Sequence, residues 1–301
     1  MPGRTNMSVD LSYAGVLAAV VVFAVPVASA RGAAAPAWEF HAMDTAFQRA
    51  PLTAAEQFDL VKELGYAGVA WHQQPAAQLR GVLDELRKRQ LRMAAIYCAA
   101  KVTPEGGISW SDDLPALFEV LADHKTIIWL HIGGRGPAFA NLSADTPAVA
   151  ELRKLADKAA QAGLKIAIYP HVGEWTARFA DAVTLAEAVN HPAFGVSFNL
   201  CHALAMGEEK NIPDLLQRAS PRLFIVTING ADSGVTGGNW ARLIQTLDKG
   251  TYDVSLVLKK LAEIGFAGPV AFQGYGIKGD ARSILAPTMQ AWKDLVSRMS
   301  R

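Results

Sequence analysis

The chain has 301 residues, of which 51% are hydrophobic and 19% charged, and its formal net charge at pH 7 is +1. A near-zero charge disfavours nucleic acid and anionic membranes as partners, because both attract strongly basic proteins. A small neutral or weakly charged ligand suits this composition better, and the length suffices for one barrel-sized domain.

The first thirty residues are typical of an export signal. Arg4 precedes an apolar run from Ala14 to Val27, and Ala28-Ser29-Ala30 forms a small-residue cleavage site. The alternative is a membrane anchor, but the run is shorter than the roughly 20 residues that a span requires and contains Pro26. We therefore expect a signal peptide over residues 1–30, a mature domain over 31–301, a periplasmic or secreted location, and no membrane partner after cleavage.

The same joint recurs along the chain, in which a helix ends on a glycine and a strand begins a few residues later. It occurs at Gly65, Gly163 and Gly265 and is typical of αβ units with parallel strands. Eight strands are predicted: Trp38–Met43, Gly68–His72, Arg92–Tyr97, Thr126–His131, Lys165–His171, Gly195–Asn199, Leu223–Asn229 and Pro269–Gln273.

Amphipathic helices are predicted between the strands, for example over Ala76–Arg89, over Pro147–Ala162 and from Ser283 onwards. Eight strands that alternate with helices favour an α/β fold of the closed (β/α)8 TIM barrel type, since no glycine-rich dinucleotide fingerprint follows an early strand. Residues 133–146 and 229–253 are too long for simple connections, so we expect them to form walls of a pocket.

The strands share a pattern in which small residues lie inside the barrel and a polar residue ends each strand. Apolar residues such as Trp71, Phe198 and Phe272 then face the helices, as would His41, while Met93 and Ala95 face inward. The predicted inward strand-end residues are His72, Tyr97, His131, Tyr169, His171, Asn199, Asn229 and Gln273. Polar groups gathered at one end of a core must find partners or bind something, so we predict that they contact a substrate.

Histidines are frequent among these positions and carboxylates are few. His131, His171 and His202 could hold a divalent metal such as manganese, zinc or magnesium, or could bind sugar hydroxyls. Glu174 is the best carboxylate for a general acid or base, although it could equally be a helix N-terminal acid. The other nearby carboxylates are Asp44, Glu208, Glu209 and Asp232, and the aromatic residues that could stack on a sugar are Trp175, Trp240 and Tyr275.

The chain has two cysteines, Cys98 and Cys201. They fall at the ends of the third and sixth predicted strands, on separate sides of a barrel, and a disulfide needs Cα atoms within about 7 Å. We expect two free thiols.

Several motifs resemble those of the xylose-isomerase-like TIM barrels, which include sugar phosphate isomerases and epimerases and endonuclease-type relatives. The motifs are Glu63-Leu-Gly-Tyr-Ala-Gly68, Asn199-x-x-His202, Asn229-Gly-Ala-Asp232, Gly250-Thr-Tyr-Asp253 and Gly268-Pro-Val-Ala-Phe-Gln273.

The resemblance implies a metal held by Glu, Asp, His and Glu on strands five to eight. This chain offers Tyr169, Asn199, Asn229 and Gln273 at those positions, and only His202 matches the family's Asp-x-x-His motif.

Two functions follow from these observations. The first is an exported carbohydrate enzyme that moves a proton next to a carbonyl, with His171, His202 or Glu174 as the acid or base and Asn199, Asn229 and Gln273 as orienting groups. Isomerisation, epimerisation and elimination would all fit. The second is a sugar-binding barrel without catalysis, because the acid–base carboxylates are replaced.

Overall fold

A computed structural model describes residue 3 and residues 38–47, 52–122 and 124–299. The predicted signal peptide lies outside these residues except for Gly3. Among the described helices, none combines the length and the apolar character that a membrane crossing requires.

The described strands form a closed parallel barrel, as predicted. Its strands are β1 (Phe40–Met43), β2 (Gly68–Trp71), β3 (Arg92–Val102), β5 (Ile127–Gly133), β6 (Lys165–Ile168), β7 (Phe194–Asn199), β8 (Leu223–Ile228) and β9 (Val270–Phe272). They follow the order β2-β1-β9-β8-β7-β6-β5-β3, and a β2–β3 pairing closes the ring. A short strand that we did not predict, β4 (Ile108–Trp110), pairs antiparallel with the end of β3, which extends β3 beyond its expected end at Tyr97.

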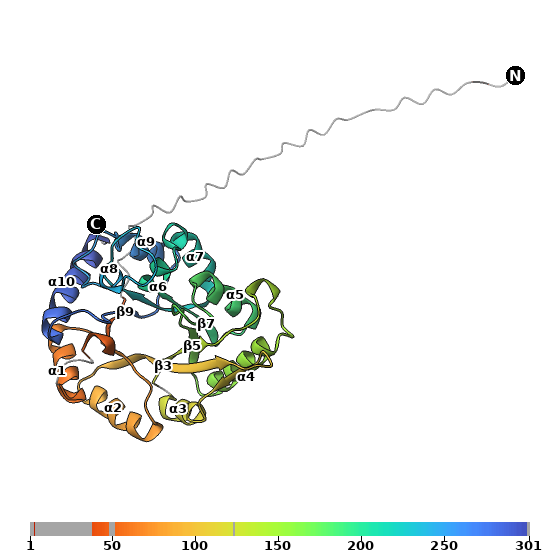
Figure 1. The fold of residues 1–301 in the computed structure, drawn as a ribbon, viewed down its shortest axis with the longest axis horizontal. Helices are drawn as coiled ribbons and strands as arrows, with labels where there is room; N and C mark the ends of the chain where they lie inside the picture. Colours follow the sequence, from red (N-terminus) through yellow and green to blue (C-terminus); the bar gives the residue numbers. More distant parts are fainter. Residues whose placement is uncertain (1–2, 4–37, 48–51, 123, 300–301) are drawn as a thin grey trace. The chain divides into compact units, whose positions relative to one another are not determined.

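Helices surround the barrel (Figure 1). They are α1 (Ala54–Leu64), α2 (Ala76–Lys88), α3 (Leu114–Leu121), α4 (Pro147–Gln161), α5 (Phe179–Val189), α6 (Leu200–Ala205), α7 (Ile212–Ala219), α8 (Trp240–Leu243), α9 (Ser255–Glu263) and α10 (Ala281–Met299), with 3-10 turns η1 (Asp44–Ala46), η2 (Phe139–Asn141), η3 (Glu209–Asn211) and η4 (Ser220–Arg222). Gly65, Gly163 and Gly265, at or just after the ends of α1, α4 and α9, have φ of 87°, 69° and 67°. This left-handed conformation strains side chains with a Cβ, which explains the glycines.

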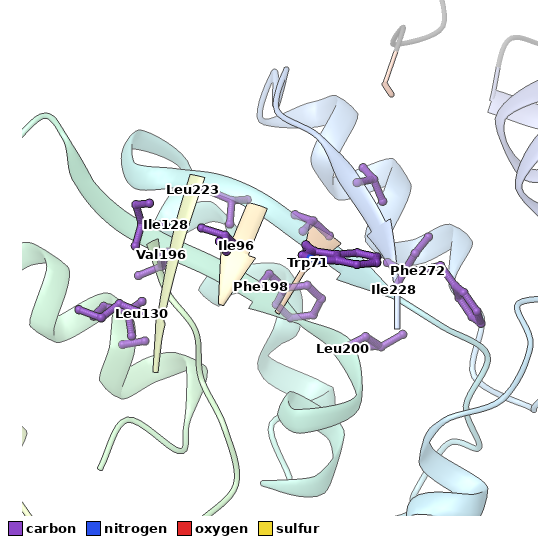
Figure 2. Close-up of a cluster of buried hydrophobic side chains, with 14 of the residues drawn as sticks. Trp71, Ile96, Ile128, Leu130, Val196, Phe198, Leu200, Leu223, Ile228 and Phe272 are labelled. Carbon is purple, nitrogen blue, oxygen red and sulfur yellow. The ribbon is translucent and has the colours of Figure 1, made fainter. Parts of the chain in front are cut away.

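Two apolar clusters lie on the two sides of the strands. The outer cluster, between strands and helices, contains the predicted helix-facing residues, including Trp71, Phe198 and Phe272 (Figure 2). The inner cluster fills the barrel with Met43, Ala70, Ala95, Trp129, Ala167, Tyr169, Ile225 and Ala271. The barrel is therefore a packed core, and a ligand can bind only at one end of it.

Two predicted orientations are wrong. His41 is fully buried and lies on the same side of β1 as Met43, a member of the inner cluster, so it does not face the helices. Met93 belongs to the outer cluster. The pairing of β2 with β3 shifts register between Val69 and Ala70, and one extra residue in a strand reverses the alternation of its side chains.

Candidate functional site

A cavity of about 570 Å³ lies where the carboxyl ends of the strands meet. Its walls come from the ends of β1, β2, β3, β6 and β9 and from α6 and α8, as expected for the ligand site of a parallel barrel. The lining residues are Asp44, Thr45, His72, Tyr97, Tyr169, His171, Val172, His202, Trp240, Ile244, Gln273 and Tyr275. Eight of the residues predicted to contact a ligand are among them: His72, Tyr97, Tyr169, His171, His202, Trp240, Gln273 and Tyr275.

The phenol of Tyr169 lies at the centre of a hydrogen-bond network. The side-chain amide of Gln273 donates to its oxygen at 3.2 Å, and the amide of Asn199 also donates to it. Tyr97 and Trp129 pack against the Tyr169 ring, with ring centroids 5.0 Å and 5.2 Å away. Burial raises the pKa of Tyr169, so this phenol stays protonated at neutral pH.

Two histidines lie beside Tyr169, and the Val172 peptide contacts both of them. Nδ1 of His171 lies 3.0 Å from the Val172 carbonyl oxygen, and the Val172 N–H donates to Nδ1 of His202 at 3.3 Å. A carbonyl accepts only and an N–H donates only, so the two contacts select opposite tautomers. In the neutral rings, Nε2 of His171 is a proton acceptor and Nε2 of His202 carries a proton.

Burial keeps both rings neutral. It lowers the pKa of His202 to about 3 and also lowers the pKa of His171, where the contact with Val172 acts in the opposite direction. The ring centroids of the two histidines are 4.4 Å apart, so the positive charge of one would further disfavour that of the other. The pocket thus presents one neutral base and one neutral N–H donor next to each other.

A third histidine is held by a buried carboxylate. Oδ2 of Asp44 accepts from the backbone N–H of His72 at 3.0 Å and lies 2.6 Å from its Nδ1, and Asp44 is only 1% exposed. These contacts place the ring proton on Nδ1. Nε2 of His72 is then an acceptor, which agrees with the side-chain amide of Gln74 lying 2.8 Å away. We did not assign Asp44 to the site from the sequence, although its position directly after β1 was a signal.

His131 and Glu174 contact each other and do not line the cavity. Nδ1 of His131 lies 3.4 Å from a carboxylate oxygen of Glu174. Glu174 also lies outside the first turn of α5, which begins at Phe179. The predicted role of Glu174 as acid or base therefore has no support from its position, and neither has the helix-terminal alternative.

Trp175 was predicted to bind substrate but packs away from the pocket. Its ring stacks on Phe139 with centroids 5.1 Å apart, and its indole N–H donates to the Pro137 carbonyl at 3.2 Å. A Cβ at residue 136 would lie 2.2 Å from the indole, so Gly136 permits this packing. The loop over 133–146 therefore uses Trp175 as an anchor.

Asn229 was also predicted to bind substrate, and it instead holds the loop that follows β8. Its amide nitrogen donates at 2.7 Å to the carbonyls of both Gly230 and Leu243, and the residue is fully buried. Because this loop carries Trp240 and Ile244 to the cavity wall, the prediction that residues 229–253 help to form a pocket agrees with the structure.

The remaining carboxylates and the thiols have structural roles. Glu208 accepts hydrogen bonds from the backbone N–H groups of Phe179 and Ala180 at the start of α5, at 2.8 Å and 3.1 Å. Both cysteines are free and buried, as predicted. Burial raises the pKa of Cys98 to about 12 and also raises that of Cys201, so neither is a nucleophile at neutral pH.

The residues present do not fit the metal ion that the family resemblance implies. Among the described residues, no three His, Cys, Asp or Glu side chains are placed to hold an ion, and this includes the predicted set of His131, His171 and His202. Nε2 of His202 carries the ring proton and has no lone pair to offer. The oxygen of Gln273 already accepts from the Thr45 hydroxyl at 2.7 Å and from the Tyr275 N–H at 3.0 Å.

A closed parallel barrel surrounded by helices, with a cavity at the carboxyl ends of its strands, defines this chain as a TIM barrel. The model of the xylose isomerase-like TIM barrel family matches residues 58–295, and the chain belongs to this family. The resemblance inferred from the motifs is thereby confirmed. A search of curated proteins gives no significant match.

Solved structures with the same fold share little sequence with this chain. The probable 3-DHS dehydratase AsbF of Bacillus anthracis is 15% identical, with a TM-score of 0.65 over 85% of this chain and 98% of its own. IolI with a bound zinc atom is 17% identical, with a TM-score of 0.66 over 86% and 98%. D-allulose 3-epimerase of Methylomonas sp. in complex with D-allulose is 17% identical, with a TM-score of 0.63 over 86% and 97%. At these identities the matches show a shared fold.

Proposed function

We propose that this chain acts on a sugar or keto-sugar derivative by moving a proton next to a carbonyl, outside the cytoplasm. The observation that carries the proposal is the Val172 peptide, which holds His171 and His202 in opposite tautomers on the wall of one cavity. An acceptor and a donor on adjacent rings are what proton removal and stabilisation of the resulting oxyanion require.

His171 is the base in this proposal. Its Nε2 lone pair takes the proton from the carbon next to the carbonyl. The C–H electron pair forms a C=C bond, and the π pair of the carbonyl moves to its oxygen to give an enolate. Burial lowers the pKa of His171, so the base is unprotonated at neutral pH. The protonated ring then returns the proton to a carbon or to a leaving oxygen.

His202 acts as a hydrogen-bond donor. The His202 ring is neutral at pH 7, because its pKa is about 3. Its one ring proton, on Nε2, can donate a hydrogen bond to a developing oxyanion. Its ring centroid lies 5.8 Å from that of Tyr169, so this donor lies next to the hydrogen-bonded phenol.

The His72 side chain lines the other side of the cavity, where its Nε2 accepts from the Gln74 amide. His72 follows β2 and His202 follows β7, which are four strands apart in either direction around the barrel. Return of the proton by His171 would give isomerisation or elimination, whereas participation of His72 would give epimerisation. All three reactions share the enolate.

A sugar ring suits the remaining wall of the cavity. Trp240 packs edge-on against His202 with centroids 5.3 Å apart, and Tyr275 is 51% exposed, so both can offer aromatic faces to the C–H face of a sugar. The D-allulose complex of a protein with this fold is in keeping with such a ligand.

Deuterium exchange tests the proposal without knowledge of the product. The protein is incubated in D2O with a panel of aldoses, ketoses and keto-glycosides, and NMR records loss of the C–H signal next to the carbonyl. We expect exchange with at least one compound, and a fall of about 10²- to 10⁴-fold in His171→Asn, the range for loss of a general base. The Asn amide can still donate to the Val172 carbonyl.

The control is His191→Asn. Nδ1 of His191 accepts from the Ala193 N–H at 3.1 Å, and the residue does not line the cavity. Exchange at the wild-type rate in His171→Asn, or no exchange with any compound, would refute the proposal.

A carbohydrate-binding barrel without catalysis is the second candidate, favoured by the neutral amides that replace carboxylates at Asn199 and Gln273. Saturable binding of a sugar in calorimetry without deuterium exchange would identify it. The proposed export predicts that the protein from its host's extracytoplasmic fraction begins after Ala30, as N-terminal sequencing would report.

A further inference from the structure

The orientation of the Gln273 amide is fixed by its neighbours. Its oxygen accepts from the Thr45 hydroxyl at 2.7 Å and from the backbone N–H of Tyr275 at 3.0 Å. A backbone N–H can only donate, so the atom it contacts is the amide oxygen. The other end of the amide, its NH2 group, therefore faces Tyr169 and donates to the phenol oxygen.

Asn199 acts on Tyr169 in the same way from the end of β7. Its NH2 group donates to the phenol oxygen, while its own oxygen accepts from the Cys201 thiol at 3.1 Å. The two amides use both lone pairs of the phenol oxygen. The Tyr169 hydroxyl can then act only as a donor, and the side chain with which it shares a further hydrogen bond is Tyr97, which also lines the cavity.

The three side chains of this network are buried. Asn199, Gln273 and Tyr169 are 1%, 4% and 0% exposed, so the donors are held in a medium of low polarity, where a hydrogen bond to developing negative charge is strong. Two N–H groups that donate to the phenol oxygen stabilise negative charge on it, which makes its O–H a better donor.

We propose that the hydrogen-bonded phenols of Tyr169 and Tyr97, held by the amides of Asn199 and Gln273, bind the carbonyl oxygen of the substrate through the Tyr97 O–H and stabilise it as an oxyanion in place of a metal ion. The inference rests on the proposed proton transfer for its substrate class, keto-sugars. It explains why neutral hydrogen-bonding residues stand at three of the positions where the family resemblance implies metal ligands.

The first experiment measures oxyanion binding with 4-nitrophenol, whose anion and neutral form absorb at different wavelengths. We expect the purified, metal-free protein to bind the probe and to favour its anion. Tyr169→Phe should weaken this binding at least tenfold. Tyr66→Phe is the matched control, because the Tyr66 hydroxyl is also buried but donates to the Leu285 carbonyl far from the cavity.

A second variant guards against a folding defect in Tyr169→Phe. In Gln273→Glu the carboxylate keeps the shape of the side chain, but it accepts a hydrogen bond from the phenol in place of donating one and adds a negative charge. The affinity for the probe anion should therefore also fall in this variant. Circular dichroism and the melting temperature establish that each variant is folded. Unchanged probe affinity in both folded variants would overturn the inference.

The second experiment titrates the wild-type protein with MnCl2 and ZnCl2 in a calorimeter. We expect no stoichiometric binding and no change in probe affinity. A one-to-one metal complex that strengthens probe binding and is lost in His202→Asn would overturn the inference. Deuterium exchange separates the two proposals: exchange that persists fully in Tyr169→Phe contradicts only this one, whereas Tyr169-dependent probe binding without any exchange contradicts only the proposed function.

Discussion

The buried histidine His202 should make the folded state less stable as the pH falls. Its pKa is about 3 in the folded protein, because burial disfavours the charged ring, and an unfolded histidine has a pKa near 6.5. Above pH ~6.5 the ring is neutral in both states. Below it, the unfolded state takes up a proton that the folded state does not accept until about pH 3, so stability is lost over this range.

The expected magnitude follows from these two pKa values. At about pH 5 the unfolded state gains roughly 2 kcal/mol relative to the folded state, and the full loss at about pH 3 approaches 4 to 5 kcal/mol. Such a change is a large share of the ~5–15 kcal/mol that stabilises a typical domain. His171, whose pKa is also lowered, adds to the effect in the same direction.

The assay is urea unfolding followed by tryptophan fluorescence at about pH 5 and about pH 7.5. His202→Asn keeps an acceptor for the Val172 N–H but does not titrate, so its loss of stability between the two pH values should be smaller than that of the wild type by about 2 kcal/mol. His191→Asn, with its matching backbone contact, should retain the wild-type dependence. Equal pH dependence in wild type and His202→Asn would refute the assignment of His202 as a buried neutral ring.

Other predictions concern the thiols, the loop after β8 and the cavity wall. Cys98 and Cys201 should resist a thiol reagent in the folded protein and react fully in urea, because both are buried with raised pKa values. Asn229→Leu should lower the free energy of unfolding in urea by about 1 to 3 kcal/mol, because the carbonyls of Gly230 and Leu243 lose their donor. Trp240→Ala should weaken sugar binding in calorimetry by roughly tenfold, about the loss of one aromatic contact, with little change in melting temperature.

The barrel could be predicted because its signals are local. Three of the αβ joints, at Gly65, Gly163 and Gly265, have a glycine with a positive φ. The strands place large apolar residues such as Trp71, Phe198 and Phe272 towards the helices. The orientation of Met93 was predicted wrongly because a register shift beside it reverses the alternation. The orientation of His41 was predicted wrongly because one polar residue in a short strand does not show which side of the sheet it lies on. The hairpin of β3 and β4 has too short a second strand to give a periodic signal.

The site was predicted in part for a related reason. Strand ends meet at one end of any parallel barrel, so the sequence suffices to bring His72, Tyr169 and Gln273 together. The sequence does not show which polar side chains line the cavity and which ones bond to other parts of the protein. Asn229 holds its own loop and Trp175 packs on Phe139, because contacts within a loop depend on the path of the backbone and not on residue type.

The tautomers in the cavity follow from backbone contacts that no motif could reveal. Val172 is an unremarkable apolar residue in the sequence, yet its two peptide groups make His171 an acceptor and His202 a donor. Asp44 does the same for His72. Each ring is therefore held in one tautomer by a group that takes no part in the proposed reaction. Burial keeps His171 and His202 uncharged. In the proposed reaction, the negative charge of the enolate would therefore be balanced by the positive charge of the newly protonated His171. In the proposed reaction, this wall of the cavity carries opposite charges only while the enolate exists, and a phenol and an imidazole N–H then stabilise the oxyanion.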